Sequence, residues 1–373
     1  MIKVLHLITK LEFGGAQQNT LHTVTHLDRT GFEPVLASGA GGYFDSKAEN
    51  FRSTCPTFWL KHLIREIRPL SDLLAFIEIF LLIRRLKPHI IHTHSSKAGI
   101  LGRWAAYFAG TPVIIHTFHG FGFHDRQKRP LRNFLIWIEK ITAKITTALV
   151  YVSKENIRIA KEHCIPGKAE QVLIRSGIDI AKYKKSESRD TIRERLGFNS
   201  TRKIAVTIGN LKKQKNPKDF FNIAQALKSK LPDALFLFVG GDDKNNILGD
   251  IPENSRHLGW REDTADLLKA ADIFVLTSLW EGLPRSVLEA LCAGIPVCAY
   301  ATDGVKEVVI HGQNGFISDC ADLKSITKHV SDILSDTQLR DKMSKCAASS
   351  IDAEFDINKM VKDQEVLYKR LFL

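Results

Sequence analysis

The feature that most constrains the fold of this chain is a regular alternation of short apolar runs with longer amphipathic stretches. Short apolar runs are typical of strands buried on both faces, whereas amphipathic stretches are typical of helices with one buried face. A chain that repeats this alternation builds parallel sheets covered by helices. We therefore predict an α/β protein.

The apolar runs of the first half predict strands at Lys3–Ile8, Pro34–Ala37, Ile90–Thr93, Val113–Thr117 and Ala148–Val152. The amphipathic stretches predict helices at Gln17–Leu27, Leu70–Arg85, Ala98–Phe108, Leu131–Ile145 and Lys154–Glu162. The second half restarts the pattern, with strands at Lys203–Ile208, Leu235–Val239, Ile273–Leu276 and Pro296–Ala299. Between the halves, the polar stretch Ile180–Asn199, which contains KKSESRD, predicts a domain linker.

The chain has 373 residues, and at roughly 100–200 residues per domain this length favours two domains. We predict a first domain over residues 1–183, a second over 184–350, and a final helix over 351–373. Ligands of open parallel sheets bind at the carboxyl ends of the strands, so the loops that follow the strands are where a site is expected.

The charge is distributed unevenly. The chain carries a formal net charge of +12, and residues 1–183 hold 25 Lys and Arg against 14 Asp and Glu, while the remainder holds 28 against 27. A basic surplus attracts anionic partners. We do not expect nucleic acid among them, because no recognised binding motif is present and the basic residues are scattered over strands and helices.

The sequence also bears on the compartment. The six cysteines form no C-x-x-C pair and have no metal-like spacing, which predicts reduced, buried thiols in the cytoplasm. Met1–Lys10 is typical of a first strand rather than a signal peptide. The apolar run Leu73–Ile83 contains Glu78 and is shorter than the about 20 residues that a membrane span needs. We predict a cytoplasmic chain with no transmembrane segment.

The most informative segment is LTSLWEGLPRSVLEALCAGIPVCAY, residues 276–300. A strand is followed by a loop with Glu281 and Gly282, and Pro284 suits the first turn of a helix. The glycine lets the backbone approach a ligand, and the free N–H groups of a helix N-terminus bind phosphate. Glu281 and Glu289 are eight residues apart, so one carboxylate can reach a sugar and the other a ribose.

This E-x7-E arrangement, embedded in EGLPRSVLEALCAGIPV and followed by Thr302-Asp303-Gly304, resembles the signature of the retaining glycosyltransferases of family 4. The resemblance extends from about Ile2 to Val309. It implies the GT-B architecture: two Rossmann-like parallel-sheet domains facing a deep cleft, the first on the acceptor side and the second on the donor side. It also implies that the helix over 351–373 crosses back to the first domain.

The same resemblance implies a reaction. A hexose or N-acetylhexosamine would move from a nucleotide diphosphate sugar, UDP favoured over GDP, to an acceptor hydroxyl with retention. No metal and no cofactor are expected, in agreement with the absence of an Asp-x-Asp motif. A nucleotide-sugar epimerase of the same fold is the alternative, as is a transferase to a small soluble acceptor. A dinucleotide oxidoreductase is disfavoured, because FGGAQQ is not G-x-G-x-x-G.

The resemblance carries over to single residues. Glu281 and His119, in the strand end HTFHG, match the catalytic positions, with His119 next to the transferred sugar. The positions that match the donor-binding loops are Gly15, Asn210, Lys215, Gly241, Trp260, Arg261, Gly282, Leu283 and Glu289. Asn210 stands where an arginine is commoner in the family, so that arginine's role is not transferred. His94, Lys97 and Phe121 are assigned to the acceptor side.

Glu281 has two candidate roles. It could be a covalent nucleophile, as in many retaining glycosidases. Alternatively it orients the donor sugar while the leaving phosphate helps to deprotonate the acceptor. We favour the second role, because the first half of the chain shows no evident partner carboxylate beside His119.

The basic first half suggests the nature of the acceptor. Basic residues at His124–Arg132 precede the amphipathic run Asn133–Ile145, and Lys61–Arg68 is a second basic and apolar stretch. Such stretches suit an anionic bilayer surface, although a solvated helix packed on the sheet is an equal alternative. The membrane interpretation predicts a lipid-linked saccharide acceptor, as in surface polysaccharide assembly, and a location at the inner face of the cytoplasmic membrane.

Overall fold

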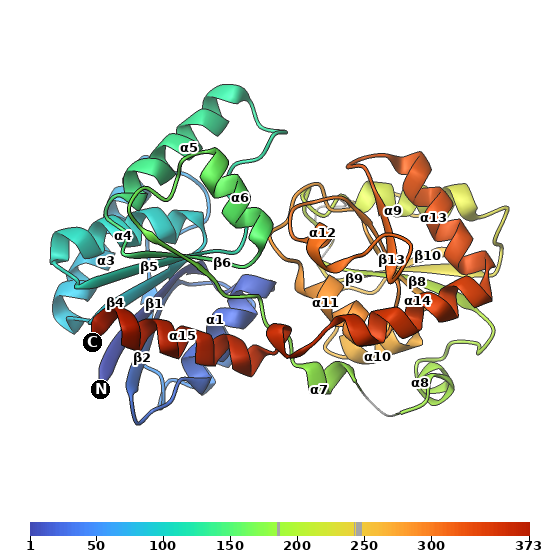
Figure 1. Ribbon diagram of the computed structural model, residues 1–373, viewed down its shortest axis with the longest axis horizontal. Coiled ribbons are helices and arrows are strands. Elements are labelled where there is room, and N and C mark those ends of the chain that lie inside the picture. The colour runs from blue at the N-terminus through green and yellow to red at the C-terminus, as the bar shows by residue number, and fades with distance from the viewer. Residues whose placement is uncertain (185–186, 242, 244–247) are drawn as a thin grey trace. The chain divides into compact units, whose positions relative to one another are not determined.

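The computed structural model describes residues 1–184, 187–241, 243 and 248–373 (Figure 1). The chain forms two compact units. Unit 1 comprises Met1–Gly177 and Ile357–Leu373, and unit 2 comprises Ile178–Asp356. Each unit contains one parallel sheet with helices, as the alternating pattern predicts.

The sheet of unit 1 has, within the described residues, seven parallel strands in the order β3-β2-β1-β4-β5-β6-β7. Their bounds are β1 (Ile2–Lys10), β2 (Phe32–Gly39), β3 (Thr57–Leu60), β4 (Ile90–His94), β5 (Val113–Phe118), β6 (Ala148–Tyr151) and β7 (Glu170–Leu173). The helices of this unit are α1 (Gly15–His26), α2 (Asp45–Asn50), α3 (Pro69–Leu86), α4 (Ser96–Ala109), α5 (Arg129–Ala143), α6 (Lys154–Glu162) and α15 (Ile357–Phe372).

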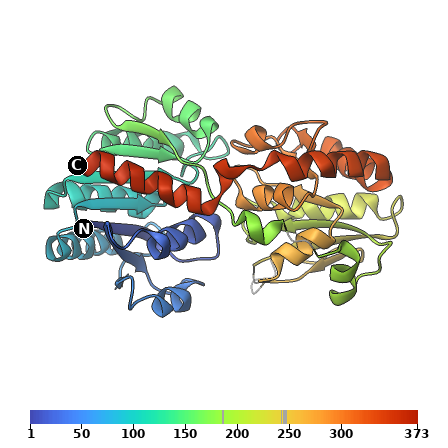
Figure 2. The same cartoon turned by 60° about the horizontal axis from the view of Figure 1, so that its bottom comes forward.

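The pleat of these strands divides the core of unit 1 into two layers. Leu5 and Leu7 of β1 pack with residues of α3 and α4. Ile2 and Val4 of the same strand pack with residues of α15, including Tyr368. Successive side chains of a strand point to opposite faces. The last helix therefore covers one face of the sheet beside α1, and α3 and α4 cover the other (Figure 2).

The sheet of unit 2 has six described strands in the order β10-β9-β8-β11-β12-β13. They are β8 (Lys203–Ile208), β9 (Ala234–Val239), β10 (Ser255–His257), β11 (Ile273–Leu276), β12 (Val297–Tyr300) and β13 (Gly315–Ser318). The helices are α7 (Ile180–Tyr183), α8 (Arg189–Arg195), α9 (Pro217–Leu227), α10 (Thr264–Ala270), α11 (Arg285–Cys292), α12 (Val305–Val308), α13 (Leu323–Ser335) and α14 (Thr337–Ser350), followed by a 3₁₀ turn at Ala353–Phe355.

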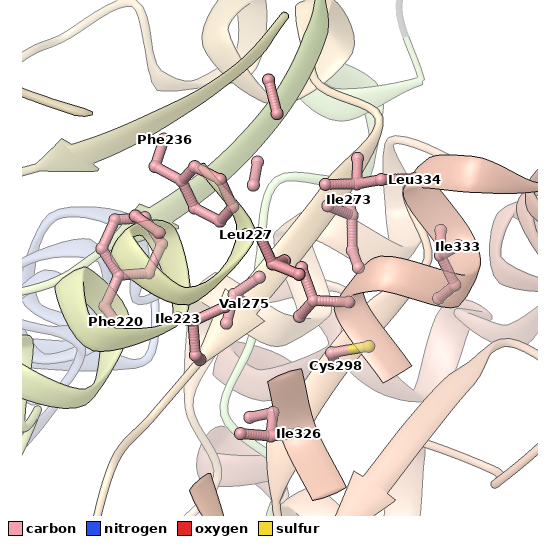
Figure 3. Close-up of a cluster of buried hydrophobic side chains, with 14 of the residues drawn as sticks. Phe220, Ile223, Leu227, Phe236, Ile273, Val275, Cys298, Ile326, Ile333 and Leu334 are labelled. Carbon is pink, nitrogen blue, oxygen red and sulfur yellow. The ribbon is translucent and has the colours of Figure 1, made fainter. Parts of the chain in front are cut away.

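One core cluster of unit 2 joins two helices to the sheet. Figure 3 shows Phe220 and Leu227 of α9 next to Phe236 of β9, with Ile273 of β11 and Ile326 of α13 in the same cluster. All of these side chains are almost completely buried. Burial of aliphatic and aromatic side chains at this density is the main source of stability of such a domain.

The apolar pattern identifies the inner strands and misses the outer ones. Each predicted strand matches an observed strand within a few residues. The observed strands that it misses are β3, β7, β10 and β13, which form the edges of the two sheets in the described structure. An edge strand pairs on one side only, and β7 and β10 are half-buried, with one exposed residue each. Their sequences, EQVL and SRH, therefore need no continuous apolar run.

The division between the units differs from the expected boundary after Tyr183. The chain leaves unit 1 after Gly177, because α7 packs on α11 and the Cys292 thiol contacts the Ile180 carbonyl. The stretch expected as a linker also contains α8, where Arg193 forms an ion pair of 2.9 Å with Asp272. Lys185 and Ser186 of that stretch lie outside the described residues.

The cysteines and helices bear on the compartment prediction. The six cysteines are free; Cys55, Cys292 and Cys298 are buried, whereas Cys164 is exposed, so burial holds for only part of the set. None of the helices in the described part of the chain is both long and apolar enough to span a bilayer.

A buried ion pair joins α4 to α5 and gives a test of this packing. Arg103 is fully buried and its guanidinium lies 2.6 Å from the Glu139 carboxylate. Glu139→Gln would leave this buried charge unpaired, so we expect the free energy of unfolding to fall by about 3–5 kcal/mol. Urea denaturation followed by circular dichroism measures the change.

The matched control is Glu162→Gln, which removes an exposed partner of Arg158. An exposed pair contributes about 0–1 kcal/mol, so this variant should unfold close to the wild-type midpoint. Equal effects of the two substitutions would contradict the structural role of the buried pair.

Candidate functional site

The loops that follow β8, β11 and β12 lie at the carboxyl ends of three neighbouring strands of unit 2. Two sets of hydrogen bonds tie them together. The Thr277 hydroxyl, after β11, donates to the carbonyls of Lys215 at 3.1 Å and Asn216 at 3.0 Å. The Gly304 N–H, after β12, donates to the Gly282 carbonyl at 2.9 Å. These bonds hold the loops in a fixed arrangement.

The central feature of this group is an ion pair between Lys215 and Glu281. The Lys215 Nζ lies 2.5 Å from Glu281 Oε1, and the side chain of Glu281 is only 8% exposed. The Glu281 N–H donates to the Asp303 carboxylate at 3.1 Å. Gly209 leaves room for the lysine stem, since a Cβ there would lie 3.2 Å from Lys215 Cδ. The sequence-predicted Glu281 and Lys215 are thus in direct contact.

Glu289 lies one turn inside α11. The helix begins at Arg285, with Pro284 as the preceding cap residue. The carboxylate of Glu289 is buried, 3.5 Å from the Arg285 guanidinium. Burial raises the pKa of Tyr183, and the charge of the nearby Glu289 raises it further. The predicted contact of Glu289 with a ribose stays a prediction.

Steric crowding explains why glycine occupies the turn after β9. Gly241 has a φ of +79°, and a Cβ there would lie 2.9 Å from the Leu211 nitrogen. Only glycine fits this position without strain. Trp260 lies close to this turn, because its ring would be 3.2 Å from a Cβ at Gly240. Asp242, in the same motif, lies outside the described residues.

The other predicted donor-side residues of unit 2 have varied surroundings. Gly282 and Leu283 are buried beside Glu281, and Asn210 is half-buried after β8. The Arg261 guanidinium forms two hydrogen bonds, of 2.8 and 2.6 Å, with the Asp263 carboxylate. The Asp263 carboxylate thus orients the Arg261 guanidinium, and the arginine side chain stays 40% exposed.

In unit 1 the predicted residues follow β1, β4 and β5. Gly15 is the first residue of α1, after an extended Gly14. His119 follows β5 directly, and its Nε2 lies 3.1 Å from His94 Nδ1. The other ring nitrogen of His94 lies 3.1 Å from His6 Nδ1. Three imidazoles are thus hydrogen-bonded in a row beneath α15.

The position of His94 does not support an acceptor-side role, because both of its ring nitrogens are engaged and the residue is 3% exposed. Lys97 is bound to α3, with its Nζ 2.5 Å from the Asp72 carboxylate. Phe121 is partly buried against Phe118 and Phe123. These residues stabilise unit 1, and their assignment to the acceptor side stays a prediction.

Burial keeps this histidine group neutral. Loss of hydration lowers the pKa of His6 to about 3 and that of His119 to about 4. The same cause holds the pKa values of His92 and His94 well below the ordinary value. At neutral pH the rings act as hydrogen-bonding groups and not as cations.

A small cavity adjoins these rings. It is lined by His94, Thr117 and His119 together with residues of α1 and α15, among them Asn19 and Gln364. Its volume of about 10 Å³ is enough for one water molecule. A sugar ring does not fit in it.

Sequence reasoning assigned no role to four residues that contact a predicted site residue or its neighbour: His6, Gln214, Asp303 and Tyr368. Asp303 and Gln214 could have been found, because both follow strands whose loops were already assigned to the site. His6 and Tyr368 could not, since a histidine inside an apolar strand and a tyrosine in the last helix are typical of ordinary core positions.

Comparison with known proteins assigns both halves of the chain. Residues 13–182 match the family model "Glycosyltransferase Family 4", and residues 188–350 match "Glycosyl transferases group 1". The chain is 31% identical to the UDP-Gal:alpha-D-GlcNAc-diphosphoundecaprenol alpha-1,3-galactosyltransferase of Escherichia coli, over 98% of this chain and 96% of that protein.

A second relative and a solved structure agree with this. The chain is 27% identical to the N,N'-diacetylbacillosaminyl-diphospho-undecaprenol alpha-1,3-N-acetylgalactosaminyltransferase of Campylobacter jejuni, over 82% of this chain and 83% of that protein. The crystal structure of Anabaena HepE in complex with UDP superposes with a TM-score of 0.80 at 20% identity, covering 99% of this chain and 100% of that one. The shared fold is the GT-B fold that the resemblance predicted.

The buried histidines predict a pH dependence of stability. An unfolded histidine has a pKa of about 6.5, whereas the folded values of His6 and His119 are about 3 and about 4. Between these values the unfolded chain binds more protons. Stability is therefore complete above about pH 6.5 and falls as the pH drops, by up to about 1.4 kcal/mol per pH unit for each histidine.

Urea denaturation measures how the free energy of unfolding changes with pH. The range from about pH 5 to about pH 8 brackets the unfolded histidine pKa of about 6.5. His6→Gln should make this pH dependence shallower, and the range above pH 7 serves as the internal control. A midpoint that does not change between pH 5 and pH 7 would show that the rings accept protons in the folded state.

Proposed function

Because this chain belongs to family 4 of the glycosyltransferases and has the GT-B fold, we propose that it transfers a hexose or N-acetylhexosamine from a UDP-sugar to a saccharide on undecaprenyl diphosphate. The proposed pathway is surface polysaccharide assembly. The observation that carries the proposal is the similarity to the Escherichia coli enzyme along nearly the whole of both chains. The Campylobacter relative also acts on a diphospho-undecaprenol acceptor.

The linkages that these two relatives form also support retention of configuration at the anomeric carbon. Both enzymes form an alpha-1,3 linkage. UDP-galactose carries its diphosphate on the α face of the sugar, so an α-linked product corresponds to retention at the anomeric carbon. We extend this stereochemistry to the present chain.

The leaving group is a nucleoside diphosphate, and its negative charge must be stabilised as the bond to the sugar breaks. Lys215 supplies one positive charge, held at a fixed position by Glu281 at 2.5 Å. The free N–H groups at the start of α11 add hydrogen-bond donors. With these groups in place, we propose a reaction that needs neither a metal ion nor a cofactor.

Glu281 suits an orienting role better than that of a covalent nucleophile. Its carboxylate is engaged by the Lys215 ammonium, and the Gln214 amide lies 3.5 Å from the second oxygen. A carboxylate held in this way is well placed to bind sugar hydroxyls but is a weakened nucleophile. In unit 1, the ring partner of His119 is the imidazole of His94. His119 would contact the transferred sugar as a neutral group.

The acceptor side would lie on the membrane surface. Unit 1 exposes a set of large apolar side chains on α3, α4, α5 and the residue run before α3: Ile67, Leu70, Leu73, Leu74, Ile77, Leu81, Tyr107, Phe108, Leu131, Phe134 and Trp137. Leu70 is 80% exposed and Leu73 57%. Helix α4 contacts both α3 and α5, so the three helices that carry these exposed side chains are neighbours in unit 1.

The surrounding charge favours an anionic bilayer as the partner of this apolar surface. Exposed basic side chains lie in both predicted stretches, Arg65 and Arg68 in the first and Lys128 and Arg129 in the second, and Arg84 and Arg85 are exposed in the last turn of α3. Helix α5 buries Ile136 and Ala143 but exposes Phe134 and Trp137. The solvated-helix alternative thus accounts for one side of α5 only. Apolar residues flanked by basic ones are typical of helices that lie at the inner face of a membrane.

A transfer assay tests the proposed reaction. With UDP-galactose as donor and N-acetylglucosaminyl diphosphate on a lipid as acceptor, we expect UDP release that depends on the acceptor. Glu281→Gln should lower kcat by about 100-fold, because a pre-positioned charged group is lost. Intact-mass spectra should show no glycosyl adduct on either protein.

Glu253→Gln is the control, since Glu253 is exposed and pairs with Lys228. UDP-glucose, UDP-N-acetylgalactosamine and GDP-mannose complete the donor panel. Conversion of the donor sugar without an acceptor would indicate an epimerase instead. A trapped adduct on Glu281 would overturn its orienting role.

Vesicle sedimentation of the whole chain tests the membrane contact. We expect binding to phosphatidylglycerol vesicles that weakens with added salt. The double substitution Leu70→Ser and Leu73→Ser should weaken it by about tenfold or more, because each buried leucine contributes about 1.5–3 kcal/mol. Val366→Ser, at an exposed apolar position on α15, is the matched control. Absence of wild-type binding at low salt would point to a soluble acceptor.

A further inference from the structure

Unit 1 contains a buried row of hydrogen-bonded rings that begins in the last helix and ends at His119. The Tyr368 hydroxyl lies 3.4 Å from His6 Nε2 and donates to Gln364 Oε1 at 3.1 Å. His6 Nδ1 lies 3.1 Å from His94 Nε2, and His94 Nδ1 lies 3.1 Å from His119 Nε2. Gln364, Tyr368, His6 and His94 are all at most 6% exposed.

The parallel register brings these side chains together. His6 of β1 pairs with His92 of β4, and Ile8 pairs with His94. Residues two apart in a strand share a face, so His92 and His94 lie on the same face of the sheet as His6. That face is the one covered by α15, whose Tyr368 is completely buried against it.

The direction of the hydrogen bonds along the row follows from its first acceptor, the side-chain oxygen of Gln364. A neutral imidazole has one N–H donor and one bare acceptor nitrogen, and burial keeps these rings neutral by lowering their pKa values. Since Tyr368 donates its proton to Gln364, its oxygen accepts from His6 Nε2–H. His6 Nδ1 is then bare and accepts from His94 Nε2–H. His94 Nδ1 in turn accepts from His119 Nε2–H.

The contacts of His92 are compatible with this direction. Its Nδ1 lies 2.6 Å from the Tyr368 hydroxyl and its Nε2 lies 2.6 Å from the Thr117 hydroxyl. When the Tyr368 hydroxyl donates to Gln364, His92 donates to the Tyr368 oxygen through Nδ1 and accepts from the Thr117 hydroxyl through Nε2. Both ring nitrogens of His92 then have a partner. His6, His92 and His94 are close enough to hold a metal ion, but the two hydrogen bonds leave His92 no free nitrogen for one.

The end of the row is the remaining nitrogen of His119. Its Nδ1 is buried and, among the described residues, has no hydrogen-bond partner. A buried polar atom without a partner is costly. In the direction derived above this atom is a bare acceptor, so the group that would satisfy it is a donor such as a sugar hydroxyl.

We propose that Gln364, Tyr368, His6 and His94 are positioning residues that hold His119 in its Nε2–H tautomer, so that Nδ1 accepts a hydrogen bond from a substrate hydroxyl. The identity of that substrate rests on the proposed function. The tautomer is a property of the free protein, and it can be measured whether or not the proposed reaction occurs.

Long-range ¹H–¹⁵N correlation spectra of the full chain, labelled with ¹⁵N-histidine, report the tautomer of each ring directly. His119→Gln assigns the signals of His119. We expect a proton on Nε2 and none on Nδ1 in the wild-type protein. Gln364→Met removes the acceptor for the Tyr368 proton, so the opposite tautomer of His119 should become populated.

Lys362→Met is the matched control, because Lys362 is exposed on the same helix. Tyr368→Phe is a second variant that removes the hydroxyl and should also mix the tautomers of His119.

The proposal is overturned by a wild-type His119 protonated on Nδ1, or by Gln364 and Tyr368 variants that leave the tautomer unchanged. Zinc or chelator shifts in the wild-type signals of His6, His92 and His94 would overturn it in favour of a metal site.

Kinetics distinguish positioning from a purely structural role. His94→Asn keeps an oxygen acceptor near the position of Nδ1 and should retain most of the kcat with UDP-galactose. His94→Leu removes the acceptor and should lower kcat about tenfold, the cost of about one hydrogen bond. Equal kcat values for the two variants would overturn the proposal. Lack of transfer by the wild type, together with the expected spectra, would overturn only the proposed function.

Discussion

Parallel pairing of strands that are buried on both faces is the constraint on which the rest of this structure depends. It brings the loops after β8, β11 and β12 to one edge of the second sheet, where Lys215, Glu281 and Asp303 meet although they are far apart in the sequence. It also sets which side chains share a face. His6 and His92 are neighbours because β1 and β4 pair in that register.

The two units compensate their buried polar side chains in different ways. In unit 2 the charges of Lys215 and Glu281 compensate each other at 2.5 Å. In unit 1 burial removes charge altogether, and the neutral rings of His6, His94 and His119 satisfy one another by hydrogen bonds. Charge compensation and neutral hydrogen bonding are thus the two ways in which this chain keeps polar side chains buried.

Much of the fold was predictable, and the errors have a common physical cause. Inner strands such as β8 and β11 are buried on both faces, so their sequences are continuous apolar runs and their bounds were predicted correctly. The edge strands β7 and β10 lack that requirement and carry polar residues. The compact units divide after Gly177 and not after Tyr183, because polarity marks a linker only when the segment does not pack, and α7 packs on α11.

The sequence by itself determined the α/β class, the family and the loop residues Glu281, Lys215 and His119, because strand burial and ligand-binding loops leave local patterns. Only the tertiary structure decided what those residues contact. The tie between Glu281 and Lys215, the row of rings from Tyr368 to His119, and the apolar surface over α3 and α5 depend on strand register and helix packing. Register and packing join residues that are distant in the sequence, so a local pattern cannot show them.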